Sequence, residues 1–355
     1  MDTKRVASVA LLFAISLVCS SCSGNKSETV KLQGAGASFP APLYLKWFKT
    51  YSAAHPSVQV DYQSVGSGSG VKSFMDRTVD FGASDAALSD AALKDMPRKV
   101  VHIPTVGGAV VLAYNLPGFD GKIQLTPDLV AGIYLGEITT WNDKKIAAVN
   151  PGVTMPAAPI LPVHRSDGSG TTNIFTTYLS AVSTRWKDVA GAATSVSWPS
   201  GVGGKGNDGV AGVVKQTPGA IGYVELAYAK QNQLPMAGVR NKAGKYVDPS
   251  AASVTAAMTG VAAQLAKDVR TPIVNSPSPD AWPISGLTFL IVYQDSKDSA
   301  KGLALARFLD WAIHDGQQYA GALEYAQLPE AIVKVNEGTL KLLTAGGKKL
   351  AAANP

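Results

Sequence analysis

Three short segments rich in glycine and serine hold the residues whose types and spacing could do chemistry. They are residues 34–40, 66–70 and 165–171, and each leads into a run with helical spacing. Glycine lets the backbone approach a ligand closely, and the unpaired N–H groups and dipole of a helix start favour an anion. One such turn is ordinary helix-cap composition. Three in one chain, one of them with an arginine, predict a site for a small anion.

A fourth glycine-rich segment, residues 203–209, also precedes a helical run. It has no obvious hydroxyl partners. We therefore favour a structural or interdomain loop there over a further anion-binding turn.

Catalytic and metal-binding motifs are absent from the sequence. Residues 66–73 resemble a phosphate loop, but Val71 separates Gly70 from Lys72, which breaks the required spacing. Residues 80–82 spell the magnesium motif of kinases without the catalytic loop that accompanies it. The four histidines are scattered and none stands at metal-ligand spacing with another. The sequence predicts no catalytic residue, no metal and no cofactor.

Strand-like and helix-like runs alternate along the chain and must position these segments. Short β-branched or aromatic runs at 58–62, 109–113, 221–224 and 287–293 predict strands, and spacing at 43–51, 174–182 and 305–312 predicts helices. This alternation favours an α/β architecture with largely parallel sheets. Residues 104–105 and 282–283 are candidate crossings between domains. Four tryptophans, at positions 47, 141, 282 and 311, are expected in the core or at an interface.

Composition limits the classes of function. The 355 residues are 46% hydrophobic and 16% charged, enough for two domains with apolar cores, and the formal net charge is +6. Basic and acidic residues are interleaved. This pattern argues against a nucleic-acid track and suits a small anionic ligand.

The N-terminus has the pattern of an export signal. Lys4 and Arg5 precede an apolar run over residues 6–18, which is shorter than the roughly 20 residues that span a bilayer. Cys22 follows two serines and resembles a bacterial lipoprotein acceptor site, although Cys19 replaces the usual aliphatic residue. We predict a signal peptide at 1–21 and a lipid-anchored tether at 22–30. Ordinary secretion with a cut nearby is the alternative.

Six segments together resemble one family. GAGASFPAP, VDFGASDAALSD, RSDGSGTT, GGKGNDG, PGAIGYVELAYAKQN and DAWPI occur in this order between about residues 32 and 335. This set closely resembles the periplasmic phosphate-binding proteins (PstS) of high-affinity phosphate ABC transporters. The resemblance implies a type II-like, two-lobed periplasmic binding protein, with two mostly parallel sheets flanked by helices and the ligand in the cleft. Lobe I would comprise 31–104 and 283–345, lobe II 105–282, and 346–355 a C-terminal tail.

The resemblance also implies a set of phosphate-binding residues. Ser38 stands where family members often have threonine, which keeps the hydroxyl. A carboxylate at Asp85 would accept the proton that phosphate carries near neutral pH, and Asp167 would orient the Arg165 guanidinium. The implied set is Ser38, Phe39, Ser67, Asp85, Arg165, Asp167, Ser169, Gly170 and Thr171.

By this resemblance the protein is a monomeric periplasmic or cell-envelope protein. It would bind inorganic phosphate and deliver it to the permease subunits of an ABC transporter, without enzymatic activity. Two alternatives stay open: a secreted phosphatase or phosphoryl-transfer enzyme, and a binding protein for another tetrahedral oxyanion such as sulfate or molybdate.

Overall fold

The structure, a computed structural model, describes residues 29–350. Its main sheet runs in the order β2-β1-β3-β11-β4-β8-β6-β7, and β9 joins β5 and β10 to it. The strands are β1 Val30–Gly36, β2 Val58–Ser64, β3 Phe81–Ser84, β4 Val100–Tyr114, β5 Gln124–Leu125, β6 Leu161–Arg165, β7 Val202–Gly204, β8 Ala220–Glu225, β9 Met236–Arg240, β10 Tyr246–Val247 and β11 Ser285–Tyr293.

Thirteen α-helices within residues 29–350 surround this sheet. They are α1 Ala41–Ala54, α2 Ser67–Met75, α3 Asp90–Lys94, α4 Pro127–Tyr134, α5 Lys144–Ala148, α6 Gly170–Val182, α7 Thr184–Val189, α8 Gly206–Gln216, α9 Leu226–Gln231, α10 Ala251–Thr259, α11 Ala262–Lys267, α12 Ser299–Ile313 and α13 Glu330–Leu340. A separate small sheet joins β12 Asp295–Ser296, β13 Thr344–Ala345 and β14 Lys348–Lys349. Residues 348–349, expected in a tail, therefore form a strand.

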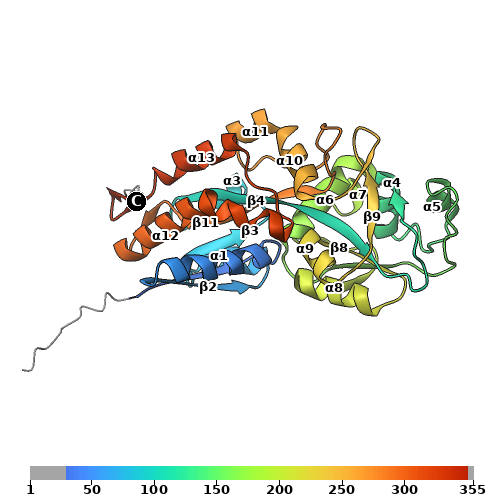
Figure 1. Ribbon diagram of the computed structural model, residues 1–355, viewed down its shortest axis with the longest axis horizontal. Helices are drawn as coiled ribbons and strands as arrows, with labels where there is room; N and C mark the ends of the chain where they lie inside the picture. Colours follow the sequence, from blue (N-terminus) through green and yellow to red (C-terminus); the bar gives the residue numbers. More distant parts are fainter. Residues whose placement is uncertain (1–28, 351–355) are drawn as a thin grey trace, which may run out of the picture.

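Two groups of elements lie side by side along the long axis (Figure 1). We call the group around β1, β2, β3 and β11, with α1, α2, α3, α12 and α13, lobe I. The group around β6, β7, β8 and β9, with α4 to α9, is lobe II. Strand β4 belongs to both, because residues 100–109 pair with β11, apart from a bulge at Thr105, and the last five residues pair with β8. Helix α10 packs on β4 and α11 on α13, so this segment lies over the junction.

The two-lobed α/β class predicted from the sequence is confirmed, but the strand directions are more mixed than expected. Parallel pairing holds for β1 with β2 and β3, and for β6 with β7 and β8. Strand β11 is antiparallel to β3 and β4, and β8 is antiparallel to β4. The reason is that β4 carries the chain from lobe I to lobe II and β11 carries it back, so these neighbours run in opposite directions.

The predicted runs form the expected elements because their apolar faces are buried. On α1, the residues Leu43, Trp47 and Tyr51 recur at helical spacing and are all buried. Trp141 and Trp282 are also fully buried, and Trp311 is partly buried. These residues are core, as expected. No helix in the described part of the chain is long and apolar enough to span a membrane.

Candidate anion-binding site

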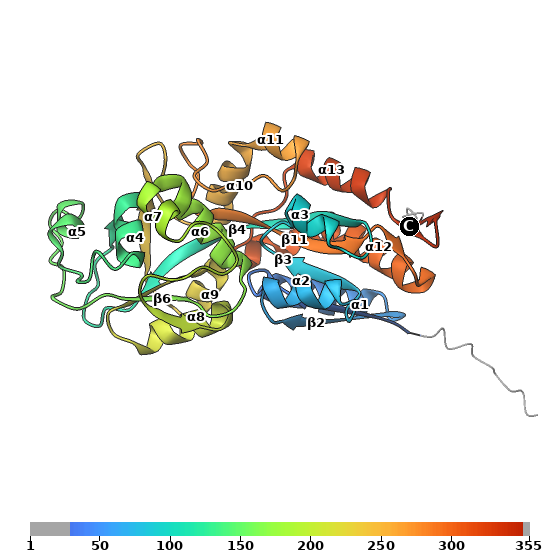
Figure 2. The ribbon, with the colours of Figure 1, turned by 180° about the vertical axis from the view of Figure 1, so that it is seen from behind.

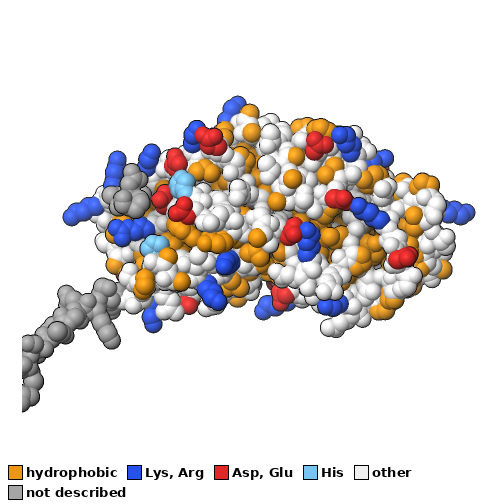
Figure 3. Space-filling model, viewed as in Figure 1, with side chains coloured by type: hydrophobic (Ala, Val, Ile, Leu, Met, Phe, Trp, Pro, Cys, Tyr) orange, Lys and Arg blue, Asp and Glu red, His pale blue; other side chains and the backbone are white. Residues whose placement is uncertain are grey.

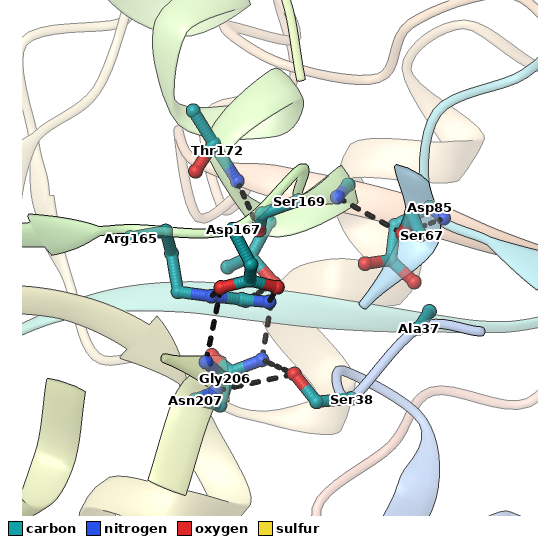
Figure 4. Close-up of polar contacts among 12 residues, drawn as sticks. Ala37, Ser38, Ser67, Asp85, Arg165, Asp167, Ser169, Thr172, Gly206 and Asn207 are labelled. Carbon is teal, nitrogen blue, oxygen red and sulfur yellow. Dashed lines mark hydrogen bonds and ion pairs between the residues drawn. The ribbon is translucent and has the colours of Figure 1, made fainter. Parts of the chain in front are cut away.

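The three glycine- and serine-rich segments meet where the carboxyl ends of β1, β3 and β6 face one another at the lobe junction (Figure 4). Ser38 lies just after β1, Asp85 just after β3, and Arg165 ends β6. Ser67 begins α2 and Gly170 begins α6. Carboxyl ends of parallel strands are the usual place for ligands in α/β sheets. All residues of the predicted set therefore lie at or beside one place.

Arg165 is held by Asp167 in a two-bond pair. The guanidinium Nε donates to Asp167 Oδ1 at 2.8 Å and Nη2 donates to Oδ2 at 2.5 Å. The N–H of Gly206 donates to the same carboxylate at 3.0 Å. Burial alone would raise the pKa of Asp167, but the hydrogen bonds and charge of Arg165 outweigh it and lower that pKa. The lowered pKa keeps Asp167 ionised, and its two hydrogen bonds fix the orientation of the Arg165 guanidinium.

Arg165 keeps donors for a ligand. Its side chain is only 1% exposed, and beyond Asp167 it donates from Nη1 to Thr171 Oγ1 at 3.3 Å. A guanidinium has five N–H donors, and these contacts use three of them. Two buried N–H groups, one on each terminal nitrogen, are left for an anion.

Ser67 joins the second and third segments directly. Its Oγ accepts hydrogen bonds from the N–H of Gly170 at 2.9 Å and of Asp85 at 3.4 Å. Nearby, the N–H of Gly68 donates to the carbonyl of Gly168 at 2.8 Å. These contacts link lobe I to lobe II, so the structure shows the two lobes closed on each other.

Helix α2 begins four residues earlier than the sequence suggested. Residues 67–70 form its first turn rather than a loop before Val71. Gly66, with φ of +90°, makes the bend. Gly70 lies so close to β1 that a Cβ there would come within 2.2 Å of the Gly36 Cα. Gly66 and Gly70 thus allow α2 to pack closely against β1, which brings Ser67 to the site.

Asp85 is an acceptor among these donors. It is 5% exposed, and its Oδ1 accepts a hydrogen bond from the Thr288 hydroxyl at 2.8 Å. Burial raises the pKa of Asp85 to about 7, against the lowering effects of Thr288 and the Arg165 charge. Within residues 29–350 no hydrogen bond reaches Oδ2, which stays available to a group that carries a proton.

Asn207, which sequence reasoning missed, connects both lobes at the site. Its N–H and Nδ2 donate to Ser38 Oγ at 3.1 and 2.9 Å, and Nδ2 also donates to Thr171 Oγ1 at 3.1 Å. Its Oδ1 accepts from the Glu225 N–H at 2.9 Å. Segment 203–209 therefore is an interdomain contact, as favoured. Its hydroxyl partner, Ser38, lies 169 residues away in sequence, so only its glycine-rich composition before a helix hinted at it.

The helix starts contribute backbone donors. Ser169 caps α6 by accepting the Thr172 N–H at 3.0 Å, which leaves its own hydroxyl proton to donate. The N–H groups of Ser38, Phe39 and Thr171 have no hydrogen-bond partner within the described residues. The Phe39 ring is buried and its carbonyl accepts from the Tyr325 hydroxyl at 2.7 Å, so only its N–H is left for a ligand.

Together these groups fit a tetrahedral oxyanion with one proton. Many hydrogen-bond donors lie around this junction together with one carboxylate that has a free oxygen, that of Asp85. The Arg165 guanidinium balances the negative charge of the anion. In the described part of the chain no group of three or more His, Cys, Asp or Glu side chains could hold a metal ion.

Comparison with known proteins shows the family to which this chain belongs. A family model described as a PBP superfamily domain matches residues 23–315. The phosphate-binding protein PstS of Xylella fastidiosa (strain 9a5c) is 44% identical over 313 residues, which cover 88% of this chain and 85% of that protein. PstS of Pasteurella multocida (strain Pm70) is 40% identical and covers 94% of both chains. The chain therefore belongs to the PstS family of phosphate-binding proteins.

A solved structure supports the fold. A high-affinity periplasmic phosphate-binding protein (PfluDING), solved with phosphate at pH 8.5, aligns with a TM-score of 0.69 at 24% identity and covers 87% of this chain and 93% of that one. At this identity the likeness concerns the fold alone.

Proposed function

We propose that this protein binds inorganic phosphate at the lobe junction, outside the cytoplasmic membrane, and delivers it to the permease of an ABC transporter. The proposal has support from the family and from the site. In this reading Arg165, Ser38, Ser67, Ser169 and Thr171 donate to the phosphate oxygens. The N–H groups of Phe39 and Thr171 add to them, Gly170 holds Ser67 in place through its own N–H, and Asp167 orients Arg165.

The main support for this proposal is the buried carboxylate of Asp85 in the site. A buried carboxylate beside an anion is unfavourable unless a hydrogen bond joins them. Phosphate near neutral pH brings a proton to that bond, whereas sulfate does not. The free Oδ2 of Asp85 and its raised pKa fit a partner that shares a proton. No second carboxylate, metal cluster or activated nucleophile is needed for binding.

Calorimetry against phosphate, sulfate, molybdate and arsenate tests the ligand. Phosphate should bind with one site per chain at micromolar affinity or better. In parallel, the protein is incubated with a phosphomonoester and released phosphate is assayed. Turnover above the buffer background would favour the enzyme alternative. Absence of phosphate binding by well-folded protein would reject the proposed function.

Phosphate should also close the lobes. The hydrogen bonds between the lobes are few, so an anion touching both sides favours the closed form through its extra contacts. Small-angle scattering is expected to give a smaller radius of gyration with phosphate than without. The same radius in both conditions, with stoichiometric binding confirmed, would contradict this prediction.

The proposed anchor, Cys22, lies outside the described residues. We propose that the signal peptide is removed before Cys22 and that this cysteine is lipidated, which keeps the protein beside its permease. Mass spectrometry of the N-terminal peptide from membranes tests it: a diacylglyceryl mass on Cys22 is expected, and an unmodified N-terminus elsewhere would mean ordinary secretion.

A further inference from the structure

A basic pocket lies at the end of lobe I away from lobe II. Its volume is about 160 Å³, and it is formed where the chain turns between α2 and β3, before β4, and between β11 and α12. Four basic side chains and two acidic ones line it: Arg77, Arg98, Lys297, Lys301, Asp80 and Asp298. The anion site described above lies at the opposite ends of β1 and β3.

Both acidic side chains of the pocket are already engaged. Asp80 pairs with Lys301 Nζ at 3.0 Å and accepts the Gln33 N–H at 2.8 Å. Asp298 caps α12 by accepting two backbone N–H groups at 2.9 and 3.0 Å. Arg77 and Lys297 are exposed and form no ion pair within residues 29–350. The pocket therefore has a net positive charge with two uncommitted cations.

Arg98 adds an unpartnered donor. Its guanidinium lies 4.0 Å from the centre of the Tyr293 ring, and Nη1 donates to the Asp295 carbonyl at 2.8 Å. Its Nε is buried and has no hydrogen-bond partner. A buried N–H without a partner is costly, and an anion in the pocket would relieve that cost.

A basic hairpin stands beside the pocket. Strand β13 pairs with β12, which leads into the pocket, and with β14. Lys341, Lys348 and Lys349 are exposed, and Leu342 is 52% exposed. We call the pocket and this hairpin the basic end face. Figure 3 shows Lys and Arg side chains at this end, next to the grey terminal residues.

The N-terminal part of the chain enters at the same end. Gly34 pairs with Phe81, the first residue of β3, so Val30 extends beyond β3 toward the pocket. Figures 1 and 2 both show the start of the coloured ribbon, at β1, at the end of lobe I away from lobe II. Cys22 is eight residues before Val30, a span of at most about 29 Å. An anchor at Cys22 would thus keep the basic end face near a membrane.

We propose that the basic end face docks on anionic phospholipid headgroups. This proposal uses the Cys22 anchor only to bring the face near the membrane, and the docking itself is electrostatic. Basic residues close to an anionic surface each strengthen binding roughly fivefold, and the attraction decays over a Debye length of about 8–10 Å. Leu342 can enter the interfacial region beside the lysines. Docking would orient lobe II and the cleft away from the lipid.

Co-sedimentation with vesicles tests the docking without the lipid anchor. The chain from residue 23 is used, because every described strand and helix lies within 29–350. It is mixed with phosphatidylcholine vesicles that contain or lack 30% phosphatidylglycerol, at about 50 and 300 mM salt. We compare Arg77→Glu/Lys297→Glu/Lys349→Glu with a matched reversal in lobe II, Lys144→Glu/Lys215→Glu/Lys242→Glu. Calorimetry with phosphate shows that each variant is folded.

The expected result is binding to anionic vesicles only, weakened at high salt. The end-face variant should lose at least about a hundredfold in affinity, since roughly fivefold is lost for each of the three removed cations and each new carboxylate adds repulsion. The lobe II variant should lose less than threefold. Equal losses in the two variants would mean a general charge effect and overturn the proposal. So would failure of the unmodified chain to bind anionic vesicles. Displacement by soluble glycerol phosphate at constant ionic strength would assign the pocket to a free phosphate ester instead. Phosphate binding in the cleft is measured separately, so either proposal can fail alone.

Discussion

The two walls of the anion site are built in different ways. On the lobe II wall, Arg165, Asp167, Gly206 and Thr171 bond to one another within the lobe. On the lobe I wall, Ser38 and Ser67 bond mainly across the junction, to Asn207 and Gly170. Asp85 alone has a side-chain partner in its own lobe, Thr288. One wall is therefore preformed, while the other completes its hydrogen bonds when the lobes meet.

This difference separates two tasks. The preformed wall can recognise negative charge before the lobes close, because its guanidinium is already oriented. In the proposed function, the lobe I wall would then accept the proton of the anion through Asp85 and stabilise the closed state. Changes on the lobe II wall should reduce capture itself. Changes on the lobe I wall should alter selectivity and closure.

The largest expected effect is the preference for phosphate over sulfate. Fully ionised sulfate would place a negative oxygen against Asp85 without a proton between them. Sites that pair a polar group of a ligand reject analogues lacking it by about 10⁴–10⁵. Calorimetry with both anions in one buffer at about pH 8.5, above the Asp85 pKa of about 7, measures the ratio with Asp85 ionised. A ratio below about tenfold, roughly 1.4 kcal/mol, would show that Asp85 does not test for a proton.

Arg165→Ala should weaken phosphate binding by about 2–5 kcal/mol, the range for truncating one partner of a buried charge pair. Arg165→Lys should recover only part, because one ammonium lacks the planar two-bond geometry. Calorimetry gives the affinities. Arg185→Ala, on the surface of lobe II, is the control and should bind normally.

Loss of Arg165 also leaves the Asp167 carboxylate without its charged partner, so the folding of this variant must be checked. The double variant Arg165→Ala/Asp167→Asn removes the uncompensated carboxylate. It should unfold at a higher temperature than Arg165→Ala yet bind phosphate no better. Recovery of tight binding in the double variant would mean that Arg165 is no ligand.

The ligand-free chain should become less stable as the pH rises through Asp85 titration. Its folded pKa is about 7 against an ordinary 3.8, so the folded state keeps a proton that the unfolded state releases. The stability contributed by this proton is fully present below pH 4 and is lost as the pH rises through 7. Asp85→Asn removes the dependence. Relative to wild type, it should gain about 1–4 kcal/mol between pH 4.5 and 8.

Urea unfolding in buffers free of phosphate and sulfate measures this gain. Asp188→Asn, at an exposed position of α7, is the matched control and should show a constant difference. Burial also raises the pKa of Glu225, and the Asp85 charge adds to that rise, so the measured gain includes the part of the Glu225 titration that depends on Asp85. If the difference in unfolding free energy between Asp85→Asn and wild type were also constant with pH, Asp85 would have an ordinary pKa.

The same contrast between the walls explains what the sequence could predict. Segments 34–40, 66–70 and 165–171 are each contiguous, so their composition before a helix indicated an anion site on both walls. The individual ligands, Asp85 and the orienting role of Asp167 came from the resemblance to the family. Asn207 was missed because its partners, Ser38, Thr171 and Glu225, are distant in sequence. Likewise, β4 and β11 are antiparallel because the chain crosses twice between the lobes. Local sequence patterns do not contain that information.

Asn207→Ala tests the contact between the walls and has the smallest expected effect. It removes the Nδ2 donor to Ser38 and Thr171 but keeps the backbone N–H that also donates to Ser38, so phosphate affinity should fall by about 1–3 kcal/mol, the range for loss of buried hydrogen bonds. The loss should be in the dissociation rate, because Asn207 acts after closure. Asn150→Ala is the matched control: Asn150 is equally buried and makes three hydrogen bonds, all within lobe II. It should lower the free energy of unfolding and leave phosphate affinity unchanged. If both variants bind phosphate as wild type does in calorimetry and stopped-flow dissociation, the Asn207 side chain does not help to hold the closed form.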